Sequence, residues 1–189
     1  GPGADALTIQ RSSAPGTPPF RIISIPSASI DARIAGLEIA NGDAGVNPGG
    51  GISNNGGTLS LSGVALTGNS TSGFGGGGLY NEGGGVVAIG NSTIADNVLN
   101  NVFNGGGGIA NQDGTVTLAA STLSGNVSTG FAGGIYNADV LDITNSTVAG
   151  NAAAGAGGGI VNLGGVLTVR STIIALNAGA SAPDLSGPL

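Results

Sequence analysis

The chain of 189 residues contains no cysteine, methionine, tryptophan, histidine or lysine. Without histidine and cysteine it has none of the nitrogen and sulfur ligands that zinc sites use, and no imidazole for acid–base catalysis. Without cysteine and lysine it also lacks two common covalent nucleophiles. These absences exclude the enzyme mechanisms that depend on those side chains. The lack of cysteine is compatible with a bacterial extracellular protein, and an extracellular or cell-surface location is what we expect.

Charged residues are also scarce. Four arginines and ten acidic residues give a net charge of −6. A surface that binds nucleic acid needs a concentration of positive charge, so we expect no nucleic-acid partner. No apolar run approaches the ~20 residues of a membrane-spanning helix, so we expect no transmembrane segment. No secretion signal is recognisable at the start, and we expect either a mature chain or a piece of a longer one.

Glycine, by contrast, is abundant: it accounts for 40 of 189 residues and marks a five-fold repeat. Each repeat has a run of small residues that ends in an aliphatic residue, and these aliphatic residues are 27, 30, 26 and 25 positions apart. The runs occupy 49–52, 76–79, 106–109, 132–135 and 157–160. Self-similarity at this period is typical of a solenoid, in which each unit buries its apolar face against its neighbours.

Two asparagine columns follow the repeat. One asparagine stands two residues after each run, and a second follows 14–16 residues later. The first column is Asn54, Asn81, Asn111, Asn137 and Asn162, and the second is Asn69, Asn97, Asn126, Asn151 and Asn177. Asparagine suits turns and tolerates left-handed backbone, and amides stacked at equivalent turns can bond to one another. We interpret both columns as structural ladders, with ligand binding as the alternative.

Aliphatic residues also form columns when the repeats are aligned on the second asparagine. They stand ten, eight and three residues before it, for example at Leu59, Leu61 and Leu66. The first two have the period-2 alternation of a strand with one buried face, and no segment has helical spacing. Each repeat therefore predicts three short strands. We predict an all-β chain, a right-handed parallel β-helix (a three-strand solenoid) of about six coils of 25–30 residues.

The whole chain, 1–189, is expected to form a single β-helix domain. Residues 1–48 make atypical N-terminal coils, with strands expected in 7–10, 20–25, 29–32 and 37–39, and residues 49–186 make the five glycine- and asparagine-rich repeats. Leucine-rich repeats have an overlapping period, but leucine does not dominate here. The calcium-binding nonapeptide β-roll is excluded because its regularly spaced aspartates are missing.

Segments such as 76–81 (Gly-Gly-Gly-Leu-Tyr-Asn) and 145–151 (Asn-Ser-Thr-Val-Ala-Gly-Asn) carry a family resemblance. They resemble right-handed parallel β-helix repeat proteins of bacterial surfaces, and are similar to the repeats of polymorphic outer-membrane proteins and autotransporter-type adhesins. The resemblance implies a secreted or surface location and a structural or adhesive role.

Few residues remain for chemistry. Glu82, Asp113 and Asp139 follow the first asparagine on consecutive coils, and could either form a solvated acidic edge or hold calcium. No other cofactor or metal is expected. Four asparagines, Asn69, Asn91, Asn126 and Asn145, begin Asn-x-Ser/Thr sequons, which would stay unmodified in a bacterial protein.

Aromatic residues are the candidates for an interaction surface. Phe74, Phe103 and Phe131 fall before glycine runs, where repeat length varies most, so they either cover the core or contact a partner or sugar. Tyr80 and Tyr136 directly follow an inward aliphatic residue and are expected to face outward.

No catalytic constellation is recognisable. The nearest to one is Asp142 with Arg170, which adjacent coils could bring together as a surface ion pair. We therefore expect a non-enzymatic, extracellular structural or adhesive protein. It could assemble end to end with copies of itself, because the ends of a β-helix carry unpaired strand edges. One alternative is a polysaccharide-cleaving β-helix enzyme, in which Asp142, Arg170 and the acids at 82, 113 and 139 would line one groove. The other is a passive carbohydrate-binding module.

Overall fold

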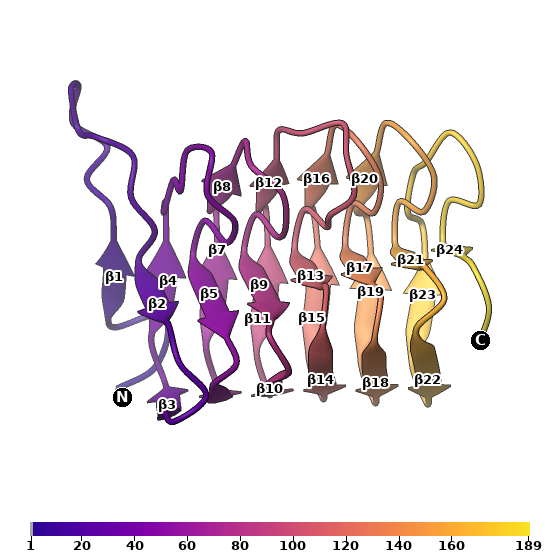
Figure 1. Ribbon diagram of the computed structural model, residues 1–189, viewed down its shortest axis with the longest axis horizontal. Coiled ribbons are helices and arrows are strands. Elements are labelled where there is room, and N and C mark those ends of the chain that lie inside the picture. The colour runs from indigo at the N-terminus through magenta and orange to yellow at the C-terminus, as the bar shows by residue number, and fades with distance from the viewer. Residues whose placement is uncertain (1) are drawn as a thin grey trace.

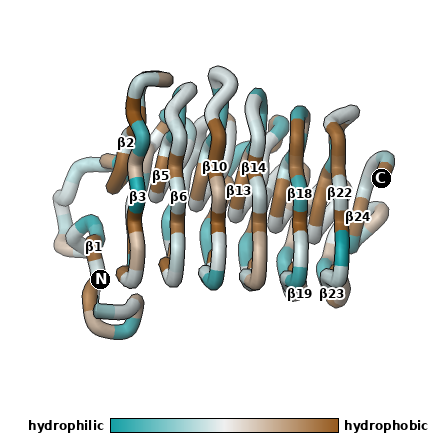
Figure 2. Tube along the Cα trace, turned by 90° about the horizontal axis from the view of Figure 1, so that it is seen from below, coloured by the Kyte–Doolittle hydropathy of each residue, from teal (hydrophilic) through white to brown (hydrophobic). Residues whose placement is uncertain are grey.

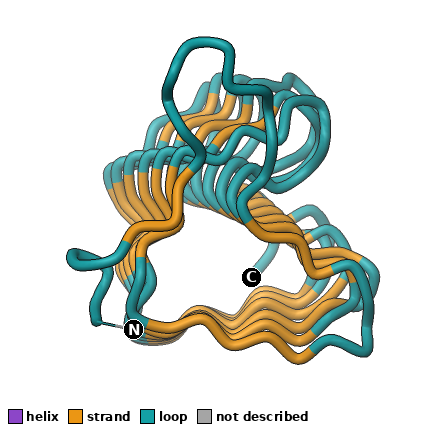
Figure 3. The backbone as a smooth tube through the Cα atoms, turned by 90° about the vertical axis from the view of Figure 1, so that its left-hand side faces the viewer, coloured by secondary structure: helices purple, strands orange, loops and turns teal. Residues whose placement is uncertain are grey.

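The computed structural model describes residues 2–189 as a parallel β-solenoid of about seven turns (Figure 1). Every pairing between its strands is parallel, and residues 2–189 contain no helix. Seen from the N-terminal end, the chain runs clockwise as it recedes, which makes the coil right-handed (Figure 3). The predicted parallel β-helix is confirmed.

Within residues 2–189, twenty-four short strands lie in four sheets, which we name A to D. Sheet A contains β1 (Thr8–Gln10), β4 (Glu38–Ala40), β7 (Ala65–Thr67), β11 (Thr93–Ala95), β15 (Thr122–Ser124), β19 (Thr147–Ala149) and β23 (Ile173–Ala175). Sheet B contains β8 (Ser70–Thr71), β12 (Val98–Leu99), β16 (Val127–Ser128) and β20 (Ala152–Ala153). Sheet C contains β2 (Ile23–Ile25), β5 (Ile52–Asn55), β9 (Leu79–Glu82), β13 (Ile109–Asn111), β17 (Ile135–Asn137), β21 (Ile160–Asn162) and β24 (Leu185–Ser186). Sheet D contains β3 (Asp31–Ala35), β6 (Thr58–Ser62), β10 (Gly85–Gly90), β14 (Gly114–Ala119), β18 (Val140–Thr144) and β22 (Val166–Arg170).

Each of the four coils from β5 to β20 passes through sheets C, D, A and B in that order, and the coils at the two ends have no sheet B strand. The three strands predicted per repeat are those of sheets C, D and A. Sheet B was not predicted, because its strands are only two residues long and too short to show a period-2 pattern in the sequence.

The core is a set of aliphatic columns inside the coil. On sheet D two aliphatic residues of each strand, two positions apart, point inward; in β18 these are Leu141 and Ile143, and both are fully buried. Residues between them, such as Asp142, are partly exposed, as predicted. Figure 2 shows this alternation of hydrophobic and hydrophilic residues along sheet D. Because equivalent residues pair coil to coil, each aliphatic side chain packs on the one before it.

Strands also form in the N-terminal segment, overlapping each of the four ranges predicted there. β1 pairs with β4, so Ile9 stands in the same inward column as Ile39. The long connection between β1 and β2 rises outside the ring of strands rather than crossing it (Figure 3).

Two corners of every coil use a residue with left-handed backbone. The residue before each asparagine of the second column has a φ near +60°. The residue that directly follows each sheet D strand, at the turn into sheet A, has a similar φ. Glycine or asparagine occupies most of these positions. Asp96, Ala120, Ser171 and Leu176 are exceptions, with φ of 56°, 48°, 48° and 61°. Side chains other than glycine and asparagine adopt this conformation at a cost, so these corners are local points of strain.

Candidate functional site

Both asparagine columns form continuous hydrogen-bonded ladders inside the coil, as predicted. In the first, the side-chain amide nitrogen of each residue donates to the side-chain oxygen of the next; Asn81 donates to Asn111 over 2.9 Å and Asn111 to Asn137 over 2.8 Å. Each amide also donates to a backbone carbonyl at the turn into sheet D, such as that of Gly114. The asparagines are buried, and their side chains form hydrogen bonds within the fold.

The first ladder begins at an unpaired atom. Among residues 2–189, Asn54 Oδ1 is the buried side-chain polar atom without a hydrogen-bond partner. The residue opposite it on the preceding coil is Ile25, which is aliphatic and cannot donate. A ladder residue is therefore missing at the first coil.

The second ladder ends in a carboxylate. Each asparagine after Asn69 accepts, through its side-chain oxygen, both the backbone N–H and the side-chain amide of the residue one coil earlier, as Asn177 does for Asn151. Beyond Asn177, Asp184 Oδ1 takes the same two bonds at 3.0 and 2.9 Å. Asp184 thus caps the ladder at the C-terminal coil.

A third ladder, of hydroxyl groups, was not predicted from the sequence. The backbone N–H of Ser92 donates to Ser121 Oγ and that of Ser121 to Ser146 Oγ, while each hydroxyl donates to a carbonyl two residues back. Thr172 ends the series, accepting from Ser146. The sequence signal of this ladder is the Ser-Thr pair that recurs at 92–93, 121–122 and 146–147.

The sequons divide into two classes. Asn69 and Asn126 belong to the second ladder and are completely buried. Asn91 and Asn145 are exposed at corners, each with left-handed backbone. Only the latter two are accessible on the folded protein.

The carboxylates considered for calcium do not come together. Glu82 accepts a hydrogen bond from the Tyr80 hydroxyl at 3.0 Å, whereas Asp139 Oδ2 accepts one from the Gly114 N–H at 2.7 Å. Asp113 uses its backbone carbonyl to accept from Gly84. Within residues 2–189 no three acidic side chains gather closely enough to share a metal ion.

The tyrosines face away from the main core, but the prediction that they form an outer surface was wrong. Tyr80 and Tyr136 are buried in a second apolar cluster with Ala110, Ala132 and Val161. Ala132 comes from the glycine-rich run itself, so that segment folds back over the outer face of sheet C. Sequence periodicity could not show this cover, because it depends on the path of the loops.

This burial alters the acidity of both phenols. Desolvation, followed by the negative charge of Glu82, raises the pKa of Tyr80, and desolvation raises the pKa of Tyr136. Burial also lowers the pKa of Arg21, against the opposing effect of Glu82. These shifts have structural causes and do not mark a catalytic group.

The phenylalanines lie on the loops between sheets B and C. Phe74 and Phe103 are stacked, with ring centroids 5.4 Å apart, and are 59% and 58% exposed. Phe131 is more covered and lies against the backbone of Gly155. Val46 and Val102 are exposed on neighbouring loops of the same series. The loops thus present apolar side chains to solvent.

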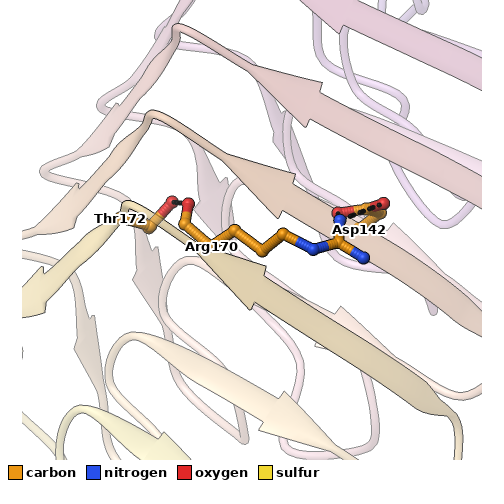
Figure 4. A network of polar contacts seen from close by, with 3 residues as sticks. All are labelled: Asp142, Arg170 and Thr172. Atoms are coloured by element: carbon orange, nitrogen blue, oxygen red, sulfur yellow. Dashed lines mark hydrogen bonds and ion pairs between the residues drawn. The ribbon is translucent and has the colours of Figure 1, made fainter.

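Asp142 and Arg170 form the predicted ion pair on the outer face of sheet D (Figure 4). Arg170 Nη1 lies 3.2 Å from Asp142 Oδ2, and Thr172 Oγ1 donates to the Arg170 carbonyl over 2.8 Å. Both charged side chains are substantially exposed, so the pair contributes little. Glu82 lies on sheet C, and no pocket among residues 2–189 unites these groups.

The C-terminal coil exposes residues that internal coils cover. Val169 and Ile174 are half-buried, although the residues one coil earlier, Ile143 and Val148, are fully buried. Ile173 beside them is 62% exposed. At the N-terminal end, Ile9 is 44% exposed although it belongs to an inward column. Core columns are thus only partly covered at both ends: Phe20 pairs with Asp43 at the N-terminal end, and the segment with Asp184 and Pro188 lies over part of the C-terminal coil.

No family model, curated protein or solved structure matches this chain. Residues 2–189 also contain no apolar helix of the length that crosses a membrane.

Proposed function

We propose that this protein is an extracellular structural or adhesive solenoid that assembles end to end into a filament. The observation that carries the proposal is the partial exposure of core-column residues at both ends. Each end presents unpaired strand edges together with aliphatic side chains, such as Ile9 and Ile174, that belong to core columns.

The physical argument concerns the sheet edges. An edge strand presents free N–H and C=O groups and is a template for another chain unless charge, proline or a covering element blocks it. The two ends differ from each other, so contact between them is head to tail. A head-to-tail contact whose rotation does not close a ring generates an open filament.

The location is supported by the composition. The surface is poor in charge and rich in small polar residues, and the repeats resemble those of bacterial surface proteins. The rod shape suits a structural element, because stacking further copies lengthens it without changing its cross-section (Figure 1).

Electron microscopy and analytical ultracentrifugation over a range of concentrations test the proposal. We expect rods longer than one molecule, and expect Ile9→Asp to prevent elongation by placing a charge in the apolar junction. Val102→Asp is the matched control, since Val102 is exposed on the loop between β12 and β13, away from both ends. Wild-type protein that stays monomeric at every concentration would contradict the proposal.

The stacked phenylalanines favour a second candidate, an adhesive surface for neutral ligands such as glycans. Exposed aromatic faces bind apolar faces of sugar rings, and neither stacked ring nor its neighbours Val46 and Val102 carries charge. We expect any glycan binding to be lost in the Phe74→Ala, Phe103→Ala double variant and retained in Phe20→Ala, another exposed phenylalanine. A glycan array read with all three proteins decides between the alternatives.

A further inference from the structure

The four sheets do not end on the same coil. Sheets A and C have seven strands each, whereas sheet D has six. At the N-terminal end sheet A extends one coil further than sheets C and D, because β1 precedes β2 and β3. At the C-terminal end sheet C extends one coil further, because β24 follows the last strands of the other sheets. Each end is therefore a step rather than a flat face (Figure 1).

The two steps are complementary. We propose that a second copy of this chain docks on the C-terminal end with a displacement of seven coils, so that its β1 pairs with β23 and its β2 pairs with β24. This inference rests on the proposed function and specifies its junction. At the C-terminal end sheet C extends one coil beyond sheet A. At the N-terminal end of the second copy sheet A extends one coil beyond sheet C, so the two ends fit together. Both sheets then continue without interruption.

The register follows from the columns. Within the chain, Thr8 is the first residue of its column in sheet A and Ile173 is the last. Across the junction Ile173 therefore lies opposite Thr8 of the second copy, and Ala175 opposite Gln10 of the second copy. The side chains that meet are compatible: Ile174 packs on Ile9 of the second copy.

Sheet C has the same property. Leu185 is the last inward residue of its column, and Ile23 is the first. The junction brings these two aliphatic side chains together, as Ile160 and Leu185 already are within the chain. Both half-covered core columns are completed by residues of the kind found throughout them.

Sheets B and D are the exceptions. Sheet B has no strand in the coils at either end, and the displacement leaves sheet D one strand short between β22 and β3 of the second copy. The start of that missing strand is occupied by the end of this chain. Asn162 donates to the Pro188 carbonyl at 2.7 Å, whereas Asn137 donates to the carbonyl of Val166, the first residue of β22. The Pro188 carbonyl thus stands where the next sheet D strand would begin.

The ladders do not cross the junction. Asp184 accepts the last bonds of the second ladder, and Ile25 precedes the first residue of the first ladder. The junction is held by backbone pairing and aliphatic contact in sheets A and C, which makes its register testable by crosslinking.

The absence of cysteine makes that test clean. In Thr8→Cys, Ile173→Cys, the predicted partners on adjacent molecules have Cα atoms about 4.8 Å apart, within disulfide range. In the control, Gln10→Cys, Ile173→Cys, the Cα separation is about 8 Å, beyond that range. The two cysteines of one molecule are roughly 30 Å apart and cannot bridge each other. Circular dichroism verifies that both variants are folded.

We expect mild oxidation to give a ladder of disulfide-linked multimers on a non-reducing gel for the first variant, at least tenfold more than for the control. Filaments in the microscope with equal crosslinking, or none, in both variants would overturn this register while leaving end-to-end assembly intact. Wild-type protein without filaments, together with uncrosslinked variants, would overturn the junction and the proposed function together.

Discussion

An interior ladder asparagine is bonded in several directions at once. Asn111 accepts from Asn81 and donates to Asn137 and to the carbonyls of Gly114 and Val140. A buried polar group left without partners costs more than the bond itself contributes. The same side chain at the end of a ladder has less to lose, because part of its bonding capacity is already unused.

Asn111→Ala and Asn54→Ala test this difference. Removing Asn111 leaves Asn137 Oδ1 unpaired, and we expect a loss of about 2–3 kcal/mol in the free energy of unfolding. Removing Asn54 eliminates one unpaired oxygen and creates another at Asn81, so about half that loss is expected. Urea denaturation measures both, and equal losses would contradict the ladder interpretation.

Leu176 is a residue whose replacement should stabilise the chain. It has a φ of 61° and is 87% exposed, so its side chain contributes little packing. Leu176→Gly removes the left-handed strain, and we expect a gain of about 1 kcal/mol in the free energy of unfolding. Leu176→Ala keeps that strain and should change little. Thermal unfolding of both variants compares them, and a gain of the same size in both would contradict the backbone explanation.

At the scale of the element, the glycine runs are where adjacent coils approach most closely. A Cβ added at Gly77 would lie 2.5 Å from the Gly107 carbonyl oxygen and 2.6 Å from that of Val98, both backbone atoms. The space between coils here is filled by main chain. Glycine is required at this position for lack of room, because the clash involves groups that cannot rotate away.

Gly77→Ala and Gly90→Ala separate this role from general glycine content. Gly77→Ala should destabilise by about 3 kcal/mol, as overpacking against rigid backbone does. Gly90 lies in β10 with nothing within 4 Å of its added Cβ, so Gly90→Ala should stabilise by about 0.5 kcal/mol through the unfolded chain. Denaturant midpoints test both signs. A similar cost at both positions would overturn the assignment.

The cover over sheet C predicts a pH dependence. The folded-state pKa of Tyr80 and Tyr136 is raised above the value of about 10 in the unfolded chain. The stability tied to the neutral phenols is therefore fully present below about pH 10 and is lost as the pH rises from there towards the folded-state values. The chain has no lysine, cysteine or histidine whose titration would add to this pH dependence.

We expect the free energy of unfolding to decline above about pH 10 in the wild type, and to decline much less in the Tyr80→Phe, Tyr136→Phe double variant. Phenolate absorbance of the native protein, followed in parallel, should rise only at higher pH than that of the unfolded chain. Phenolate formation at the same pH in both states would show that the cover is open to solvent.

At the scale of the whole molecule, the solenoid is a one-dimensional stack. Stability is then close to a sum over coils and the interfaces between them. The aligned register of β14 and β18, in which Ala119 lies opposite Thr144, means that the coils are interchangeable units. Length should therefore be adjustable without loss of the fold.

Deleting residues 120–144 removes one coil and joins equivalent positions. We expect a folded β-rich protein with a cooperative transition, a lower melting temperature and a smaller denaturant m value, since less surface is buried. Deleting 120–143 instead shifts the following strand by one residue and turns its aliphatic side chains outward, so that variant should aggregate. Circular dichroism and urea titration test the pair. Equal behaviour of the two deletions would contradict register control.

Much of the architecture could be predicted from the sequence. The spacing of Leu59 and Leu61, the recurrence of Asn54 and its equivalents, and the glycine runs together predicted parallel strands, an inward face and two ladders. The fourth sheet was not predicted, because two-residue strands leave no periodic signal. The hydroxyl ladder was not predicted although Ser-Thr pairs recur, because a recurring hydroxyl does not by itself show which group it bonds. The covering of Tyr80 was missed since period-2 alternation states which way a side chain points and not what lies above it.

The sequence by itself determined the repeat unit, because burial of one face at period 2 and turns that demand glycine or asparagine are local requirements. It also determined which chemistries are excluded, through the residues it lacks. Only the tertiary structure decided where the sheets end, which coil lacks a strand, and whether Phe74 meets Phe103. These depend on how many coils stack and on the path of loops whose lengths vary. The features on which the proposed junction depends, steps at the two ends, exist only once the coils are counted in space.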